Sequence, residues 1–180
     1  MHRVPPAGRR YERTERSGRS FSSENCATRR KKSGRRLPTR REWAPFEADG
    51  SLGTVGSTVK LTAVGAPAPY VTETTVTRAD APEVLEYNWG GFDMRWELKA
   101  SGGGTRLTLW TNIDRRFMSM GAAGWHICFD VLDHLLSGTP IGRIVGPEAM
   151  KFGGWQRLNA QYAKQFGVEI PSWPPTAQQS

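Results

Sequence analysis

The chain has 180 residues, enough for one domain of ordinary size with a tail, and its net charge is +8. Residues 1–42 hold 14 Lys or Arg and 4 Asp or Glu, a net of +10, while the remaining 138 residues have a net charge of −2. An acidic partner such as nucleic acid would therefore have to be bound by the first quarter of the chain.

Two further classes of protein are excluded by composition. No apolar run approaches the roughly 20 residues that cross a bilayer, so no membrane partner is expected, and the basic N-terminus has no apolar region typical of a secretory signal. The two cysteines, Cys26 and Cys128, form no framework of spaced pairs. A reduced, cytoplasmic setting is therefore predicted, with Cys128 as a small buried hydrophobe.

The first 41 residues contain few apolar side chains. Residues 29–41 read "RRKKSGRRLPTRR", in which eight of thirteen residues are Lys or Arg. Such a segment cannot bury enough surface to offset its ordering entropy, so residues 1–41 are predicted to be a disordered basic tail. Composition changes at "EW" (42–43), where a domain over 42–168 is expected to begin, followed by a Pro-rich tail over 169–180.

Alternation of apolar and polar residues predicts antiparallel strands in the first part of this domain. The clearest is "FDMRWELKA" (92–100), where Phe92, Met94, Trp96 and Leu98 face one way and charged residues face the other. The other predicted strands cover residues 57–64, 69–79, 83–89 and 106–113. Short links, including the turn "SGGGT" (101–105), predict a meander with one buried face and one solvated face.

The apolar period then becomes helical. "GAAGWHICFDVLDHLLSG" (121–138) places Trp125, Phe129 and Leu132 on one stripe, and Gly138 marks its end. A loop over 139–153 and a second helix over 154–167 follow. Because a sheet with one apolar face needs a cover, the predicted fold class is α+β, a curved antiparallel sheet wrapped around a long C-terminal helix.

Four segments together resemble the SRPBCC/START-like superfamily, and within it the group of homologues of the activator of heat-shock-protein-90 ATPase. They are "EWAPFEADGSLGTVGSTVKLT", "VLEYNWGGFDMRWEL", "GGTRLTLW" and "AAGWHICFDVLDHLLSG". The resemblance covers about residues 42–168 and implies a helix-grip fold, in which an apolar cavity lies between the sheet and the long helix. Many bacterial members of that family are small cytosolic proteins with no assigned ligand.

The resemblance stops before residue 42. Family members open with a strand and two short helices that end in a pattern like "P-x-x-V-W-x-A-L-T-D-P-x-x-L-x-x-W", where this chain has "RRKKSGRRLPTRREW". One allowed codon set for residues 29–40, read from the third base of its first codon, gives Pro-Glu-Glu-Val-Trp-Ala-Ala-Leu-Ala-Asp-Pro. We hypothesise that residues before about Arg41 are translated out of frame, which leaves the N-terminal strand and helices missing. Resequencing the gene tests this hypothesis.

No catalytic constellation, metal site or cofactor is expected from the sequence. His126, Asp130 and His134 recur along one helix, but the span exceeds the reach of one metal ion, and we interpret them as a solvated polar face. The glycine-rich turns lack the lysine and following helix of a phosphate-binding loop.

The expected ligand-binding side chains are those predicted to face the space between sheet and helix. They are Trp89, Met94, Trp96, Leu109, Trp125 and Phe129. Such a set either lines a cavity or forms plain core, because a sequence does not reveal a void.

Three functions remain open at this point. The first is a cytoplasmic helix-grip protein that binds a small hydrophobic or amphipathic ligand. The second is a stress- or chaperone-related protein-interaction module, which only the family's name implies. The third is nucleic-acid binding through residues 29–41, expected to be nonspecific and steeply dependent on salt. The sequence does not assign an oligomeric state.

Overall fold

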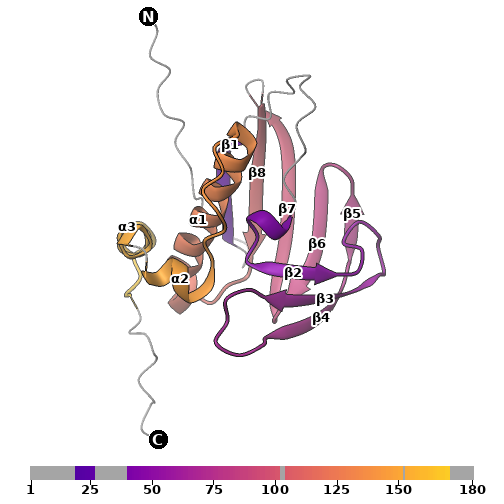
Figure 1. The fold of residues 1–180 in the computed structure, drawn as a ribbon, viewed down its shortest axis with the longest axis horizontal. Coiled ribbons are helices and arrows are strands. Elements are labelled where there is room, and N and C mark those ends of the chain that lie inside the picture. Colours follow the sequence, from indigo (N-terminus) through magenta and orange to yellow (C-terminus); the bar gives the residue numbers. More distant parts are fainter. Residues whose placement is uncertain (1–18, 27–39, 102–103, 152, 171–180) are drawn as a thin grey trace, which may run out of the picture.

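The computed structural model describes residues 19–26, 40–101, 104–151 and 153–170, and its strands form two antiparallel sheets (Figure 1). The strands are β1 (Arg19–Cys26), β2 (Phe46–Asp49), β3 (Thr58–Ala63), β4 (Val71–Thr75), β5 (Arg78–Asp80), β6 (Val84–Trp89), β7 (Phe92–Ser101) and β8 (Gly104–Thr111). The helices are the 3-10 turns η1 (Arg40–Glu42) and η2 (Arg115–Phe117) and the α-helices α1 (Met118–Ser137), α2 (Gly146–Lys151) and α3 (Gly153–Phe166). The predicted α+β class, with a curved sheet and a long C-terminal helix, is confirmed.

The larger sheet has the strand order β1-β8-β7-β6-β5, and the smaller has the order β2-β3-β4. Strands β6, β7 and β8 follow one another as the predicted meander. Their register places Leu85 opposite Trp96 and Trp96 opposite Leu109. Because side chains alternate between the two faces, these three residues share the inner face of the sheet.

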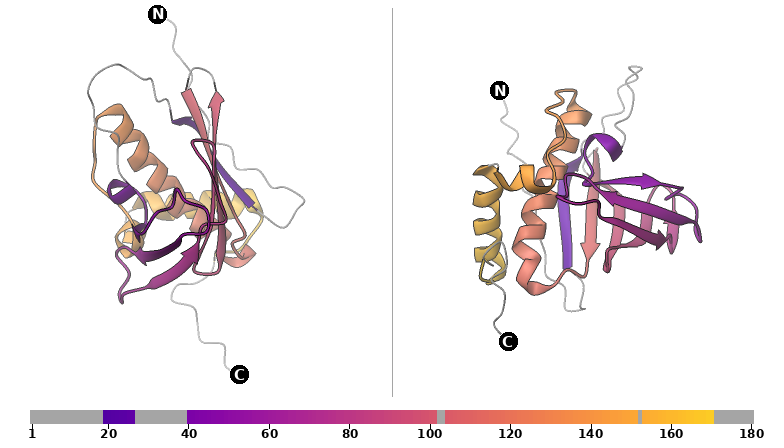
Figure 2. Two further views of the ribbon diagram at one scale, coloured as in Figure 1. Left: turned by 90° about the vertical axis from the view of Figure 1, so that its right-hand side faces the viewer. Right: turned by 60° about the horizontal axis from the view of Figure 1, so that its bottom comes forward.

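The chain changes sheets between β4 and β5, where the sequence predicts one strand over 69–79. The amide of Val76 donates to the carbonyl of Ser57, next to β3, whereas the amide of Thr77 donates to the carbonyl of Glu86 in β6. The two sheets therefore meet at a corner, because a strand that switches partners lets the surface bend (Figure 2). The prediction of a single strand here is wrong for that reason.

Strand β1 lies in the segment predicted to be disordered. It pairs antiparallel with β8, with Arg19 opposite Thr111 and Ser23 opposite Leu107. The predicted disorder and the predicted loss of an N-terminal strand are therefore corrected at residues 19–26, and η1 corrects the disorder at residues 40–41. Strands pair at an open sheet edge through their backbone groups. Side-chain composition therefore does not predict this pairing.

The rest of that tail, residues 1–18 and 27–39, lies outside the described residues. So do residues 171–180 of the Pro-rich tail and the centre of the "SGGGT" turn, residues 102–103. Strand β7 ends and β8 begins on either side of that turn, with Ser101 opposite Gly104. The predicted loop over 139–153 contains the short helix α2, so the prediction of a loop is wrong at residues 146–151.

Helix α1 is covered on two sides. Its apolar stripe packs on the inner face of the sheet, and its other side contacts α3, which runs back along it (Figure 2). Gly138 ends the helix as predicted, with φ of 82° and its amide on the carbonyl of Leu135. None of the described helices is long and apolar enough to cross a membrane.

The predicted solvated face of α1 is partly an interface between helices. His126 Nδ1 lies 2.5 Å from the hydroxyl oxygen of Tyr162 in α3, and the Tyr162 ring stacks on Phe166. The interpretation of His126 as solvated is therefore corrected. The polar positions on α1 could not reveal the partner helix, because that helix begins more than a dozen residues further along the chain.

Candidate ligand-binding pocket

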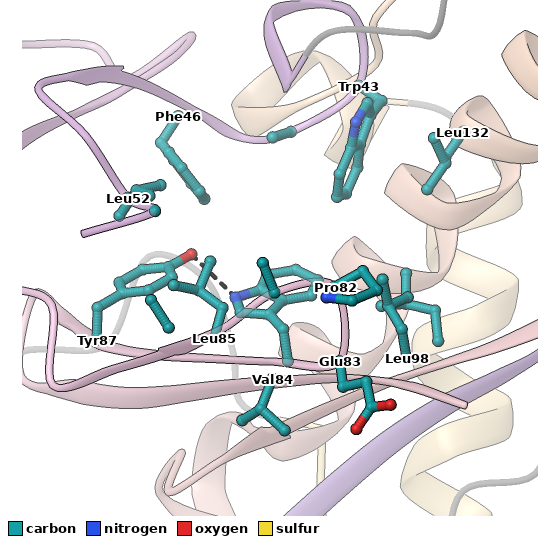
Figure 3. Close-up of a pocket in the computed structure, with 16 residues that line it drawn as sticks. Trp43, Phe46, Leu52, Pro82, Glu83, Val84, Leu85, Tyr87, Leu98 and Leu132 are labelled. Carbon is teal, nitrogen blue, oxygen red and sulfur yellow. Dashed lines mark hydrogen bonds between the residues drawn. The ribbon is translucent and has the colours of Figure 1, made fainter. Parts of the chain in front are cut away.

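A pocket of about 420 Å³ lies between the inner face of the larger sheet and residues 43–53, which include β2 (Figure 3). We call the first side the floor and the second side the roof. The roof residues are Trp43, Ala44, Phe46, Leu52 and Gly53. The floor residues are Ala79, Leu85, Tyr87, Trp96, Leu98 and Leu107. The turn 81–83, with Val84, forms one end, and Leu132 of α1 completes the lining.

The floor follows directly from strand alternation. Leu85 and Tyr87 are two residues apart on β6, and Trp96 and Leu98 are two residues apart on β7, so each pair faces the same side. Leu98 lies opposite Leu107 of β8. The meander thus presents a continuous apolar surface to the pocket.

The roof is built by a short strand and a tight turn. Phe46 of β2 lies opposite Ala63 of β3 and is 2% exposed. Gly50 turns the chain with φ of 112°, and a Cβ atom there would lie 2.9 Å from the carbonyl oxygen of Thr58. Glycine at this position therefore allows the loop after β2 to fold back and place Leu52 in the pocket.

An aromatic cluster supports the pocket from behind. The ring of Trp96 lies edge-to-face with that of Trp125 at 5.2 Å and with that of Trp43 at 6.1 Å. Phe129 of α1 contacts both Trp96 and Trp125, at 6.3 and 6.0 Å between ring centroids. Trp96 therefore joins the roof, the floor and the long helix, and its ring has neighbours on several sides.

Hydrogen-bonding groups in the lining are few. The indole nitrogen of Trp96 donates to the hydroxyl of Tyr87 at 3.0 Å. Among the described residues that line the pocket, Glu83 is the only charged one, and its carboxylate points away from the cavity (Figure 3). The pocket therefore suits an uncharged molecular surface, because a buried charge without a partner is strongly disfavoured.

The six residues predicted to bind a ligand lie close together, but they divide between wall and core. Trp96 lines the pocket. Trp89, Trp125 and Phe129 belong to the aromatic cluster behind it. Met94 and Leu109 share the inner face with Trp96, but they are 3% and 0% exposed and are part of the core.

The roof residues were not predicted from the sequence. Trp43, Ala44 and Phe46 come directly after the basic tail and before the first predicted strand. The apolar cluster in "EWAPF" was a usable signal, since it is the first such group in the chain. Leu85 and Leu98 follow the same alternation that selected Trp96, and the pattern could have included them.

The polar residues of α1 do not gather into a metal site. His126 Nε2 lies 3.5 Å from Asp130 Oδ2, while His134 Nδ1 lies 3.0 Å from the hydroxyl of Thr139. Within the described part of the chain, no group of three His, Cys, Asp or Glu side chains could hold a metal ion.

Fold and pocket together define an α+β domain with a curved antiparallel sheet, a long helix and an apolar pocket. No family model and no curated protein matches the chain. Solved structures do, and two determinations of the protein CalU16 from Micromonospora echinospora are among them. The crystal structure is similar with a TM-score of 0.52 and 19% identity, over 83% of this chain and 88% of that chain. The solution structure has a TM-score of 0.53 and 18% identity, over 88% and 96%.

A protein from Rhodobacter sphaeroides is similar with a TM-score of 0.54 and 14% identity, over 72% of this chain and 97% of that chain. At such identities the similarity concerns the fold alone.

Proposed function

We propose that this protein binds a small hydrophobic or amphipathic ligand between the roof and the floor of the pocket. We further propose that it is a cytoplasmic member of the SRPBCC/START-like superfamily, in the group named for the activator of heat-shock-protein-90 ATPase. The observation that carries the binding proposal is the pocket of about 420 Å³ with apolar walls. Its size falls within the roughly 300–1,000 Å³ of ordinary small-molecule sites.

The pocket is open to solvent, so its apolar walls are in contact with water when it is empty. Exposure of apolar surface to water is unfavourable. A ligand that fills the space removes apolar surface from water at about 25 cal/mol per Å². Burial of these walls by a bound ligand is therefore favourable, which supports the binding proposal.

The exposed turn 81–83 favours an amphipathic occupant. Ala81, Pro82 and Glu83 are all exposed, and they border one end of the pocket. A ligand can place its apolar body against Trp96 and keep a polar group in water at this end. Among the described residues of the lining, Glu83 carries the one carboxylate, and it points away from the space (Figure 3).

Binding of a neutral apolar dye tests this proposal. We expect N-phenyl-1-naphthylamine to gain fluorescence with the wild-type protein, and we expect Ala79→Phe, which adds a ring inside the pocket, to weaken binding at least about tenfold. Ala68→Phe is the matched control, because Ala68 is exposed and does not line the pocket. Thermal unfolding confirms that both variants are folded.

Equal dye binding by the two variants, or none by the wild type, would contradict the proposal. Native mass spectrometry of the purified protein adds an independent test. We expect a mass excess from a co-purified ligand in the wild type and a smaller occupancy in Ala79→Phe.

A further inference from the structure

The roof is the edge of the smaller sheet. Strand β2 has four residues and pairs on one side with β3. Just before it, the carbonyl of Pro45 accepts a hydrogen bond from the amide of Val64 at 2.9 Å. Successive carbonyls of an extended chain point to opposite sides, so those of Ala44 and Phe46 point away from β3.

Arg143 donates hydrogen bonds to those two outward carbonyls. Its Nε donates to the carbonyl oxygen of Ala44 at 2.8 Å, and its Nη2 donates to that of Phe46 at 3.1 Å. Its Nη1 donates to Oε1 of Glu47 at 2.6 Å. The guanidinium thus takes the place of a neighbouring strand along the open edge, with three of its N–H groups used.

The position of Arg143 in the chain makes this contact a tie between distant parts of the fold. Arg143 lies in the loop between α1 and α2, 96 to 99 residues after the groups that it contacts. Its side chain is only 17% exposed, so water competes weakly for these bonds. By comparison, Nε of Arg41 lies 3.0 Å from Oε2 of Glu47, but the Arg41 side chain is 79% exposed. That ion pair is expected to contribute little to stability.

The residues held in this way are the same residues that close the pocket. Trp43, Ala44 and Phe46 line it from above, and the carbonyls of Ala44 and Phe46 are those that Arg143 binds. Releasing Arg143 removes every hydrogen bond described for the outer side of the roof and leaves its pairing with β3 and the ring contacts of Trp43 and Phe46. Movement of the roof away from Trp96 would then widen the pocket.

We infer that Arg143 is a positioning residue that holds the roof closed, and that breaking its contacts with residues 44–47 sets the rate at which an apolar ligand enters and leaves. The role in ligand exchange rests on the proposed function. The role in holding the roof does not, so the two are tested by separate measurements.

Hydrogen exchange in the ligand-free protein tests the hold on the roof. Arg143→Lys keeps the charge but cannot serve three acceptors in one plane, so we expect amides within 43–49 to exchange about tenfold faster. Amides of β7 and β8 are expected to keep their rates. Arg95→Lys is the matched control, because Arg95 binds Glu86 and Glu97 on the outer face of the larger sheet, away from the roof.

Two results would overturn this role. One is an unchanged exchange rate within 43–49 in Arg143→Lys. The other is an equal increase in β7 and β8, which would mean that Arg143 stabilises the whole domain and does not hold the roof in particular.

Stopped-flow binding of N-phenyl-1-naphthylamine tests ligand exchange. In Arg143→Lys both the association and dissociation rates are expected to rise several-fold, so the dissociation constant changes less than either rate. Arg95→Lys should match the wild type. Unchanged rates in Arg143→Lys would overturn the role in exchange. A wild type that binds no dye would reject the proposed function and with it this exchange role, while the hydrogen-exchange result alone would decide whether Arg143 holds the roof.

Discussion

The indole nitrogen of Trp96 donates a hydrogen bond to the hydroxyl oxygen of Tyr87, 3.0 Å away, on the floor of the pocket. Tyr87 lies opposite Met94 in the sheet, so Trp96 is its diagonal neighbour on the same face. The bond satisfies a partly buried indole N–H and fixes the direction of the Trp96 ring. The floor is therefore ordered by one polar contact within an apolar surface.

Tyr87→Phe removes the acceptor of this bond. We expect the free energy of unfolding to fall by about 1 kcal/mol, because the indole N–H is left without its protein partner. Urea denaturation measures the change. Tyr70→Phe is the control, since Tyr70 is 49% exposed, and equal stability of the two variants would argue against a role for the bond.

Cys128 is expected to be unreactive in the folded protein. Burial raises the pKa of its thiol from 9.0 to about 12, and the charge of Arg143 offsets this only in part. Iodoacetamide at pH 8 should therefore label the peptide containing Cys128 only as fast as the protein unfolds, since the thiolate is the reactive form. Mass spectrometry of the digested protein measures this. Rapid labelling of Cys128 without denaturant would contradict the prediction that this thiol is unreactive in the folded protein.

The same raised pKa has a consequence for stability in alkali. The unfolded chain releases the Cys128 proton more readily than the folded one, so the stability contribution is complete below about pH 9 and is lost as the pH rises toward 12. Cys128→Ala should show a shallower loss of unfolding free energy across that range. Parallel profiles for the two proteins would contradict this expectation.

Glu97 should contribute stability at neutral pH that disappears in acid. Burial acts to raise the pKa of its carboxyl, but hydrogen bonds from Arg95 and Lys99, with the charges of both, outweigh it and lower the pKa below 4.5. The contribution is present above about pH 4.5 and is lost as the pH falls through the lowered value. We expect Glu97→Gln to be less stable than wild type by about 1 kcal/mol at pH 7. The difference should shrink toward pH 3, as measured by urea denaturation, and a constant difference would refute this account.

Strand β1 should stabilise the domain although its sequence is polar. Removing residues 1–26 exposes the edge of β8, so we expect the thermal unfolding midpoint to fall and aggregation to increase. A truncation that removes residues 1–18 and keeps β1 is the control. Equal midpoints for the two truncations would mean that the pairing of β1 with β8 contributes little. The out-of-frame hypothesis for residues before about Arg41 stays a prediction, and gene resequencing decides it.

The sequence by itself determined strands β3, β6, β7 and β8 and helices α1 and α3, together with the side of the longest strand and helix that faces inward. The alternation in β7 assigned Met94 and Trp96 to the inner face, and the helical stripe did the same for Trp125 and Phe129. Gly138 marked the end of the long helix. These features follow from local geometry, since a period of two or of 3.6 residues fixes which side chains share a face.

Only the tertiary structure decided which inward-facing residues meet an empty space. Leu109 and Trp96 lie opposite each other in the sheet and have the same pattern, yet Leu109 is core and Trp96 is wall. The difference depends on whether another layer of the fold packs directly on the side chain. That is decided by the distance between elements that lie far apart in the chain. The bond from Arg143 to the roof spans nearly 100 residues for the same reason. Periodicity gives a side chain its direction, but only packing gives it a neighbour or a void.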